Sequence, residues 1–229
     1  IGLVDWQVSS LLTGEYYCER IAALTRSATD ELFNLADKVT ANDEYTAGKI
    51  FESLLKTGIG MSFSQNSRPA SGSEHIISHL IECVQLRDGI LPNFHGEDIG
   101  VCTLEMLKYY NELAEHKTIK TKKENVDWDD VYKFYGSMAD NVKKLNFPHN
   151  VVDDVDKDVL RERWGDIVNI IHSVPDYNSV KEAMVKAHCK ITVDDIGKDK
   201  TLFDNCVKYS PYMRHRLTLL RLKDMIVTE

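Results

Sequence analysis

The chain has 229 residues, of which 43% are hydrophobic and 28% are charged, and its formal net charge at pH 7 is −8. These values are typical of a globular protein with one large domain or two small ones, and the acidic balance argues against a nucleic-acid partner, because a phosphate backbone requires a basic surface. The sequence contains no signal peptide and no apolar run close to the ~20 residues that a membrane span needs.

Helical periodicity dominates the chain, because apolar residues recur three and four positions apart. Asn42 is expected to cap the third helix. Ser71 and Glu74 match the S-x-x-E capping box, and Ser179 with Glu182 repeats this signature. In chain order, the predicted helices span residues 1–12, 15–39, 43–63, 71 onward, 96–116, 128–142, 159–173, 180–187 and 211–226.

The sequence predicts one all-α domain of roughly nine or ten helices over residues 1–229. Ser210 followed by Pro211 is a strong start for the last helix. The segment HCKIT, residues 188–192, is a short strand candidate, and the basic run 117–124 is interpreted as a solvated loop. No Gly-rich phosphate-binding loop follows a strand, so a nucleotide-binding half is not expected in this chain.

Two further features concern the origin of the polypeptide. The five cysteines are odd in number, widely spaced and lack a CxxC pair. This pattern is typical of free thiols in a reducing cytosol and predicts a cytoplasmic protein. Because the chain begins without Met and inside a helical pattern, we expect Ile1 to be a cut end rather than a natural terminus.

Three histidines form the candidate site. His75 and His79 are four residues apart, so they project from the same face of a helix. His95 follows a short loop at the start of the next helix, which can bring His75 and His95 together. Two imidazoles with a carboxylate suit a divalent metal ion such as zinc, nickel or iron. From the spacing alone, the alternative is surface histidines or hydrogen-bonded core histidines.

Four segments of the sequence together resemble the sn-glycerol-1-phosphate dehydrogenase family: LTGEYYC, SRPASGSEHIISH, FHGEDIGVCT and RHRLTLLRL. This family belongs to the superfamily of iron-type alcohol dehydrogenases, glycerol dehydrogenase and dehydroquinate synthase. SRPASGSEHxxSH is the specific part of the resemblance, which runs along the whole chain. It implies the multi-helical C-terminal domain of the dehydroquinate synthase-like fold, with the N-terminal nucleotide-binding α/β domain absent from this chain.

The resemblance also implies a metal held by one Asp and two His. By motif, His75 and His95 match the two histidine ligands. His79 matches a histidine that contacts the substrate, where it would hydrogen-bond a hydroxyl or relay a proton; its alternative is a polar residue at the domain interface. The Asp ligand would lie before residue 1, so Asp5 is expected to be a solvated or capping carboxylate.

Residues next to these histidines have expected supporting roles. The second nitrogen of each ligand histidine should donate to a carboxylate or carbonyl, which fixes the tautomer. Glu74 and Glu97 are close in sequence, and helix capping is the preferred role for Glu74. Ser67 and Arg68 precede the histidine-bearing helix and are expected to bind a substrate phosphate, because a guanidinium fits phosphate bidentately. The alternative for Arg68 is a salt bridge that stabilises the loop.

The implied reaction is the reversible reduction of dihydroxyacetone phosphate to sn-glycerol 1-phosphate with NADH or NADPH, bound mainly by the absent domain. A dication would polarise the ketone and stabilise the alkoxide. The expected partner is a small phosphorylated substrate, a homo-oligomer is compatible with the sequence, and the isolated chain is expected to be inactive. Two alternatives stay open: a glycerol dehydrogenase or dehydroquinate synthase-type enzyme of the same fold, and a non-catalytic helical module.

Overall fold

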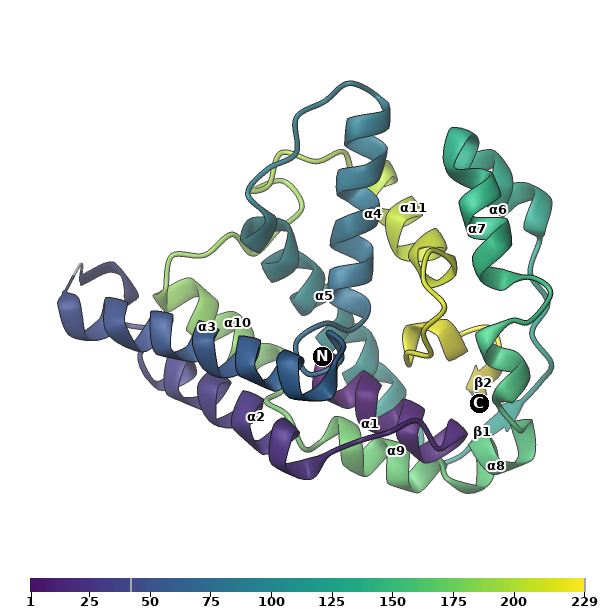
Figure 1. Ribbon diagram of the computed structural model, residues 1–229, viewed down its shortest axis with the longest axis horizontal. Helices are drawn as coiled ribbons and strands as arrows, with labels where there is room; N and C mark the ends of the chain where they lie inside the picture. The colour runs from purple at the N-terminus through teal and green to yellow at the C-terminus, as the bar shows by residue number, and fades with distance from the viewer. Residues whose placement is uncertain (42, 229) are drawn as a thin grey trace.

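The computed structural model describes residues 1–41 and 43–228, and most of them are helical (Figure 1). The predicted all-α architecture is confirmed, with one two-stranded sheet in addition. The helices are α1 (Gly2–Thr13), α2 (Glu19–Asn34), α3 (Glu44–Ser64), α4 (Ser73–Arg87), α5 (His95–Ala114), α6 (Trp128–Tyr135), α7 (Ala139–Asn146), α8 (Lys157–Glu162), α9 (Trp164–Ile171), α10 (Tyr177–Lys186) and α11 (Lys200–Tyr209).

Helix α4 stands at the centre of the molecule and packs against α5 and α11 (Figure 1). Its side chains Ile77, Leu80 and Ile81 are fully buried. They belong to one apolar cluster that also includes side chains of α1, α5, α9 and α11. Burial of each such side chain contributes about 1.5–3 kcal/mol relative to exposure. Packing on several sides therefore fixes the position of α4, which carries two of the three candidate histidines.

The second helix is shorter than predicted. It begins at Glu19 instead of residue 15, because the residues before it serve other contacts. Glu15 forms a salt bridge with Arg68, and the Tyr16 carbonyl accepts a hydrogen bond from the Trp6 indole. The apolar periodicity continues through the segment between α1 and α2, but polar atoms of this segment form hydrogen bonds with distant parts of the chain.

Two predicted helix starts use a neighbouring aspartate as the cap. Asn42 lies outside the described residues, and the side chain of Asp43 caps α3 by accepting from the Thr46 backbone N–H. Helix α10 begins before the predicted capping box, because Asp176 accepts from the Ser179 backbone N–H. The aspartate carboxylate is as good a cap as the serine hydroxyl, so the cap lies one residue from the predicted position in α3 and three residues from it in α10.

Two long predicted helices are each divided into two shorter ones. The segment 128–142 forms α6 and α7, which are separated at Gly136, whose φ of 55° lies in the left-handed region that glycine tolerates. The segment 159–173 forms α8 and α9, which meet at Arg163 with a φ of −90° and a ψ of 8°. The apolar pattern predicts the helical residues correctly and misses the bends.

The predicted helix over 211–226 is wrong. Its backbone groups are used by distant side chains: the Leu217 carbonyl accepts from the Arg68 guanidinium, and the Leu219 N–H donates to Asp5. Four leucines of this segment are buried, so the segment runs through the core and their spacing does not mark one face of a helix. The structure forms two 3₁₀ turns, Ser210–Tyr212 and Leu220–Leu222, and the strand β2 (Ile226–Thr228).

The small sheet lies where the sequence suggested a loop. Strand β1 (Ile119–Thr121) falls within the basic run 117–124 and pairs antiparallel with β2, with Ile119 opposite Thr228. Ile119 is buried, so this run is not fully solvated. The segment 188–192 is not a strand, and His188 there has a left-handed φ of 54°.

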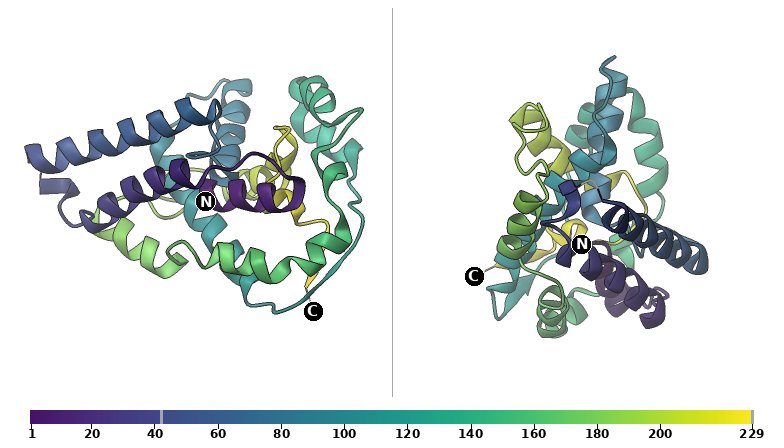
Figure 2. Two further views of the ribbon diagram at one scale, coloured as in Figure 1. Left: turned by 60° about the horizontal axis from the view of Figure 1, so that its bottom comes forward. Right: turned by 90° about the vertical axis from the view of Figure 1, so that its left-hand side faces the viewer.

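Helices α2 and α3 form a hairpin that projects from the rest of the molecule (Figure 2). Helix α3 exposes several large apolar side chains, among them Phe51, Leu54, Leu55, Ile59 and Phe63. None of the helices in the described ranges is long and apolar enough to cross a membrane. Contacts between α2 and α3, together with ion pairs along the hairpin, hold the two helices against each other.

Those charge pairs should make the hairpin sensitive to acid. Lys49 and Lys56 each bridge Glu31 and Glu52, and their hydrogen bonds lower the pKa of Glu31 and lower that of Glu52 to about 2. A lowered folded-state pKa means that the stabilisation is present above the ordinary value of 4.5 and is lost as the pH falls toward 2. We expect amide hydrogen-exchange protection of α2 and α3 to fall between about pH 6 and about pH 3 more than that of α9, which carries no carboxyl with a lowered pKa. Equal losses in α9 would contradict this expectation.

Candidate metal and substrate site

The structure brings His75, His79 and His95 together. Helix α4 places His75 and His79 one turn apart, and α5 begins at His95 after the connecting loop folds back. The ring centroid of His95 lies 5.6 Å from that of His75 and 5.0 Å from that of His79, and the centroids of His75 and His79 are 6.3 Å apart. Three imidazoles from two helices therefore face one small volume.

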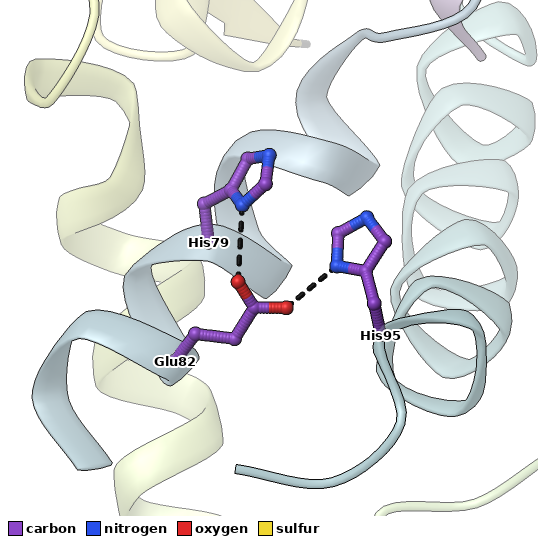
Figure 3. Close-up of side chains that lie close together, drawn as sticks. All are labelled: His79, Glu82 and His95. Atoms are coloured by element: carbon purple, nitrogen blue, oxygen red, sulfur yellow. Dashed lines mark hydrogen bonds and ion pairs between the residues drawn. The ribbon is translucent and has the colours of Figure 1, made fainter. Parts of the chain in front are cut away.

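Glu82 joins two of these rings, and the sequence analysis did not identify it. Its Oε1 lies 2.5 Å from Nδ1 of His95, and its Oε2 lies 3.1 Å from Nδ1 of His79 (Figure 3). Burial opposes ionisation of the carboxyl, but the hydrogen bonds with His95 and His79 lower the pKa of Glu82. The i, i+3 spacing of His79 and Glu82 on one helix was the available signal.

Glu74 supports the third ring. Its Oε1 lies 2.8 Å from Nδ1 of His75 and also accepts from the Gly72 backbone N–H. The capping role and the histidine-orienting role, which the sequence presented as alternatives, are thus combined in one buried carboxylate. Burial is the largest influence on this carboxyl and opposes its ionisation, but the hydrogen bonds with His75 and Gly72 and the neighbouring positive charges together lower the pKa of Glu74. Glu97 lies in the first turn of α5, and its side chain makes no hydrogen bond to these rings.

All three rings have Nδ1 within hydrogen-bonding distance of a carboxylate, which suits neutral imidazoles with the proton on Nδ1 and a free lone pair on Nε2. In Figure 3, the second nitrogens of His79 and His95 lie on the side away from Glu82. Carboxylate–histidine pairs of this kind orient metal-ligating histidines. A second donor set is also close together, since one ligand atom each from His79, Glu82 and His95 lie within 4.8 Å of one another. The first set offers nitrogen donors and the second offers nitrogen and oxygen donors, and zinc, nickel and iron accept both kinds.

A buried ion pair supports the start of α5. Asp98, one turn after His95, is fully buried, and its Oδ2 lies 3.6 Å from Lys198 Nζ. Lys198 also donates to Gln85 on α4. Burial raises the pKa of Asp98 although Lys198 opposes this. This contact ties α5 to α4 directly behind the histidine cluster.

Asp5 is a capping carboxylate, as expected, but it is not solvated. It is fully buried and accepts from the backbone N–H and the hydroxyl of Ser73, from the Tyr110 hydroxyl and from the Leu219 N–H. Helix α4 consequently begins at Ser73, and the predicted Ser71 cap is wrong because Asp5 takes over its function. Burial raises the pKa of Asp5, and the hydrogen bonds from Tyr110 and Leu219 oppose this.

Arg68 and Ser67 lie in the loop before α4. The Arg68 side chain is buried and donates to both carboxylate oxygens of Glu15, to the Leu217 carbonyl and to the Ser9 hydroxyl. This is the salt bridge that the sequence offered as the alternative role. The contact of Arg68 with a substrate phosphate stays a prediction, and its donors are already engaged. The Ser67 hydroxyl accepts from Arg216.

Replacement of Glu82 tests the orienting role of this carboxylate. We expect Glu82→Gln to weaken Zn²⁺ binding by about 10- to 100-fold, because an amide cannot accept from both imidazoles with full charge. Calorimetric titration of the folded chain with Zn²⁺ measures the effect. Glu112→Gln, at an exposed position on α5, is the matched control and should bind Zn²⁺ like the unchanged chain. Equal affinity of both variants would exclude an orienting role for Glu82.

Comparison with curated proteins identifies relatives that are named glycerol-1-phosphate dehydrogenase [NAD(P)+]. The chain is 27% identical over 218 residues to the protein of Halalkalibacterium halodurans. These aligned residues are 95% of this chain and 48% of the relative. The chain is 36% identical over 111 residues to the protein of Bacillus licheniformis, and 37% identical over 105 residues to that of Methanosarcina acetivorans, in each case over 28% of the relative. No family model matches. The resemblance found in the sequence is confirmed, and the chain spans about half or less of the length of these relatives.

Proposed function

We propose that this chain is the metal- and substrate-binding domain of an NAD(P)-linked dehydrogenase that interconverts dihydroxyacetone phosphate and sn-glycerol 1-phosphate. The observation that supports it most directly is the cluster of three imidazoles, each with Nδ1 next to a carboxylate oxygen, in a chain whose relatives carry that dehydrogenase name. In this proposal residues 1–229 form one functional unit, and NAD(P) binds mainly to a further domain.

We assign the metal to His75 and His95, on the motif and on the geometry of their rings. When bound, the dication supplies Lewis-acid polarisation of the substrate oxygen, which makes the carbon a better hydride acceptor or donor. Glu74 and Glu82 hold the two rings with Nδ1 protonated, so that Nε2 is available as a donor atom. Zinc is the first candidate, and nickel and iron accept the same donor set.

His79 is the proposed catalytic residue of this chain. Its ring lies next to those of both ligand histidines, and its Nδ1 lies 3.1 Å from Glu82. The free Nε2 can donate to or accept from a substrate hydroxyl, and the Glu82 carboxylate stabilises the ring in either protonation state. This arrangement would let His79 move a proton at the substrate hydroxyl, and NAD(P) held by the further domain would supply the hydride chemistry.

The proposal is tested with the polypeptide that contains this chain together with its nucleotide-binding half. NADH or NADPH oxidation should require dihydroxyacetone phosphate and should stop after chelation of the metal. Turnover with glycerol and NAD⁺, without use of the phosphate ester, would identify a glycerol dehydrogenase instead. Absence of both metal binding and turnover would favour the non-catalytic helical module.

A further inference from the structure

A second pair of histidines comes together from two segments that are far apart in the chain. His149 follows α7 and precedes the 3₁₀ turn Val151–Asp154, and His215 follows the 3₁₀ turn Ser210–Tyr212. Their ring centroids are 6.0 Å apart. This separation lies within the range of 5.0 to 6.3 Å that the three imidazoles of the candidate site show among themselves. The fold therefore brings these two rings as close together as those of the candidate metal site.

Two carboxylates flank the His149 ring, one at each nitrogen. Asp154 Oδ2 lies 3.1 Å from Nε2, which is a hydrogen-bonding distance. Asp153 Oδ2 lies 3.8 Å from Nδ1, which is too long for a hydrogen bond. It is close to the separation of about 3.4 Å between two ligand atoms that each lie about 2.1 Å from one tetrahedral zinc ion. In the neutral tautomer that donates from Nε2 to Asp154, the Nδ1 lone pair and the Asp153 carboxylate are both able to bind a cation.

The other groups near this pair are arranged to keep these donors in place. His215 Nδ1 lies 3.1 Å from the Leu145 carbonyl oxygen, which can only accept, so Nδ1 carries the proton and Nε2 keeps a free lone pair. Backbone carbonyls orient metal-ligating histidines in this way. The Asp153 carboxylate accepts from the Asn150 backbone N–H, which fixes the start of the 3₁₀ turn. Each donor thus has a neighbour that holds it in position.

We propose that His149, His215 and Asp153 form a second site for a divalent transition-metal ion, with Asp154 as the positioning residue for His149. Two imidazole nitrogens and one carboxylate oxygen are a donor set that zinc, nickel and copper accept. A bound ion would link the 3₁₀ turn Val151–Asp154 to the segment after Tyr212. The proposal does not depend on the proposed function, because none of these residues belongs to the first histidine cluster.

This second site should bind Zn²⁺ more weakly than the first cluster. His79, Glu82 and His95 already have ligand atoms within 4.8 Å of one another. The side chains of the second site are exposed, with 54% of the His149 side chain accessible to solvent, and they have to turn toward an ion before they can bind it. Their rotation costs conformational entropy, but it disturbs no buried packing.

Titration calorimetry of the folded chain with Zn²⁺ tests the proposal without any enzyme activity. The unchanged chain should show two binding events, and His149→Ala and His215→Ala should each lose the weaker one. Asp154→Asn should weaken that event by about 10- to 100-fold, because the ring loses its orienting carboxylate. His172→Ala removes another exposed histidine and is the matched control, which should keep both events. His75→Ala should weaken the tighter event and leave the weaker one unchanged.

Thermal unfolding provides a second readout. Zn²⁺ should raise the Tm of His75→Ala, because the ion binds two segments that meet only in the folded state, and the additional change His149→Ala should abolish this rise. Both variants should have the same Tm without metal, since His149 is exposed. Retention of both binding events by His149→Ala and His215→Ala would overturn the proposal. Equal losses in His172→Ala would do the same, because they would show that any exposed histidine contributes.

Discussion

Replacement of His75 or His95 by alanine is expected to lower the Zn²⁺ affinity of the folded chain by about 100-fold each. The binding free energy of structural zinc sites is about 10–16 kcal/mol over four ligands. One ligand therefore corresponds to about 3 kcal/mol, which is about two orders of magnitude in the dissociation constant. Both rings are held by carboxylates and face the same volume, so each substitution removes a donor that is already oriented for the metal. Calorimetric titration with Zn²⁺ gives the affinity of each variant.

The variant His79→Ala distinguishes the two possible donor sets. If His75 and His95 hold the metal, His79→Ala should retain Zn²⁺ affinity within about threefold and lose turnover in the complete enzyme by about 10²–10⁴-fold. If the close group of His79, Glu82 and His95 is the site, His79→Ala should lose Zn²⁺ affinity and His75→Ala should keep it. His172→Ala, at an exposed position outside the cluster, is the control.

Asp5→Ala is expected to lower the free energy of unfolding by about 3–5 kcal/mol, because several buried donors lose this acceptor and each buried donor left unsatisfied costs about 1–3 kcal/mol. The substitution leaves the buried donors of Ser73, Tyr110 and Leu219 without an acceptor. Urea unfolding followed by far-UV circular dichroism measures the change. The effect should extend to α4 as a whole, because its first turn loses its cap.

Two comparisons make this second prediction specific. Asp30→Ala, at an exposed position on α2, should change stability by less than about 0.5 kcal/mol. Gly72→Ala should destabilise the chain by displacing the Asp5 carboxylate, since an added Cβ would lie 2.5 Å from Asp5 Oδ2 and 2.8 Å from Gly2 Cα. A fully stable Asp5→Ala variant would show that water can enter and satisfy these donors.

The sequence predicted the histidine cluster because its geometry is local. A spacing of four residues places His75 and His79 on one helix face, and a short loop limits how far His95 can lie from them. The position of Glu82 was also accessible from its spacing to His79. Its role was missed because the resemblance pointed to carboxylates elsewhere, and because exposed i, i+3 pairs are usually solvated.

The sequence could not predict contacts between segments far apart in the chain. The apolar run around Leu217–Leu222 has helical spacing, but Arg68 and Asp5 occupy its backbone groups, and nothing local indicates either residue. The buried role of Asp5 has the same origin, since its partners lie 68, 105 and 214 positions away. Local patterns predict most of the helices, but long-range polar pairing decides where they stop and prevents a helix at Leu217–Leu222.

The carboxylate of Asp5 has a consequence for biosynthesis. It joins α1, the first turn of α4 and Leu219, so segments up to 214 positions apart meet at one carboxylate. A ribosome releases Leu219 long after it has released Ser73, and until then Asp5 cannot complete its set of donors. The histidine-bearing helix should therefore reach its final anchored state only after Leu219 has left the ribosome, and nascent chains arrested before this leucine should remain protease-sensitive there.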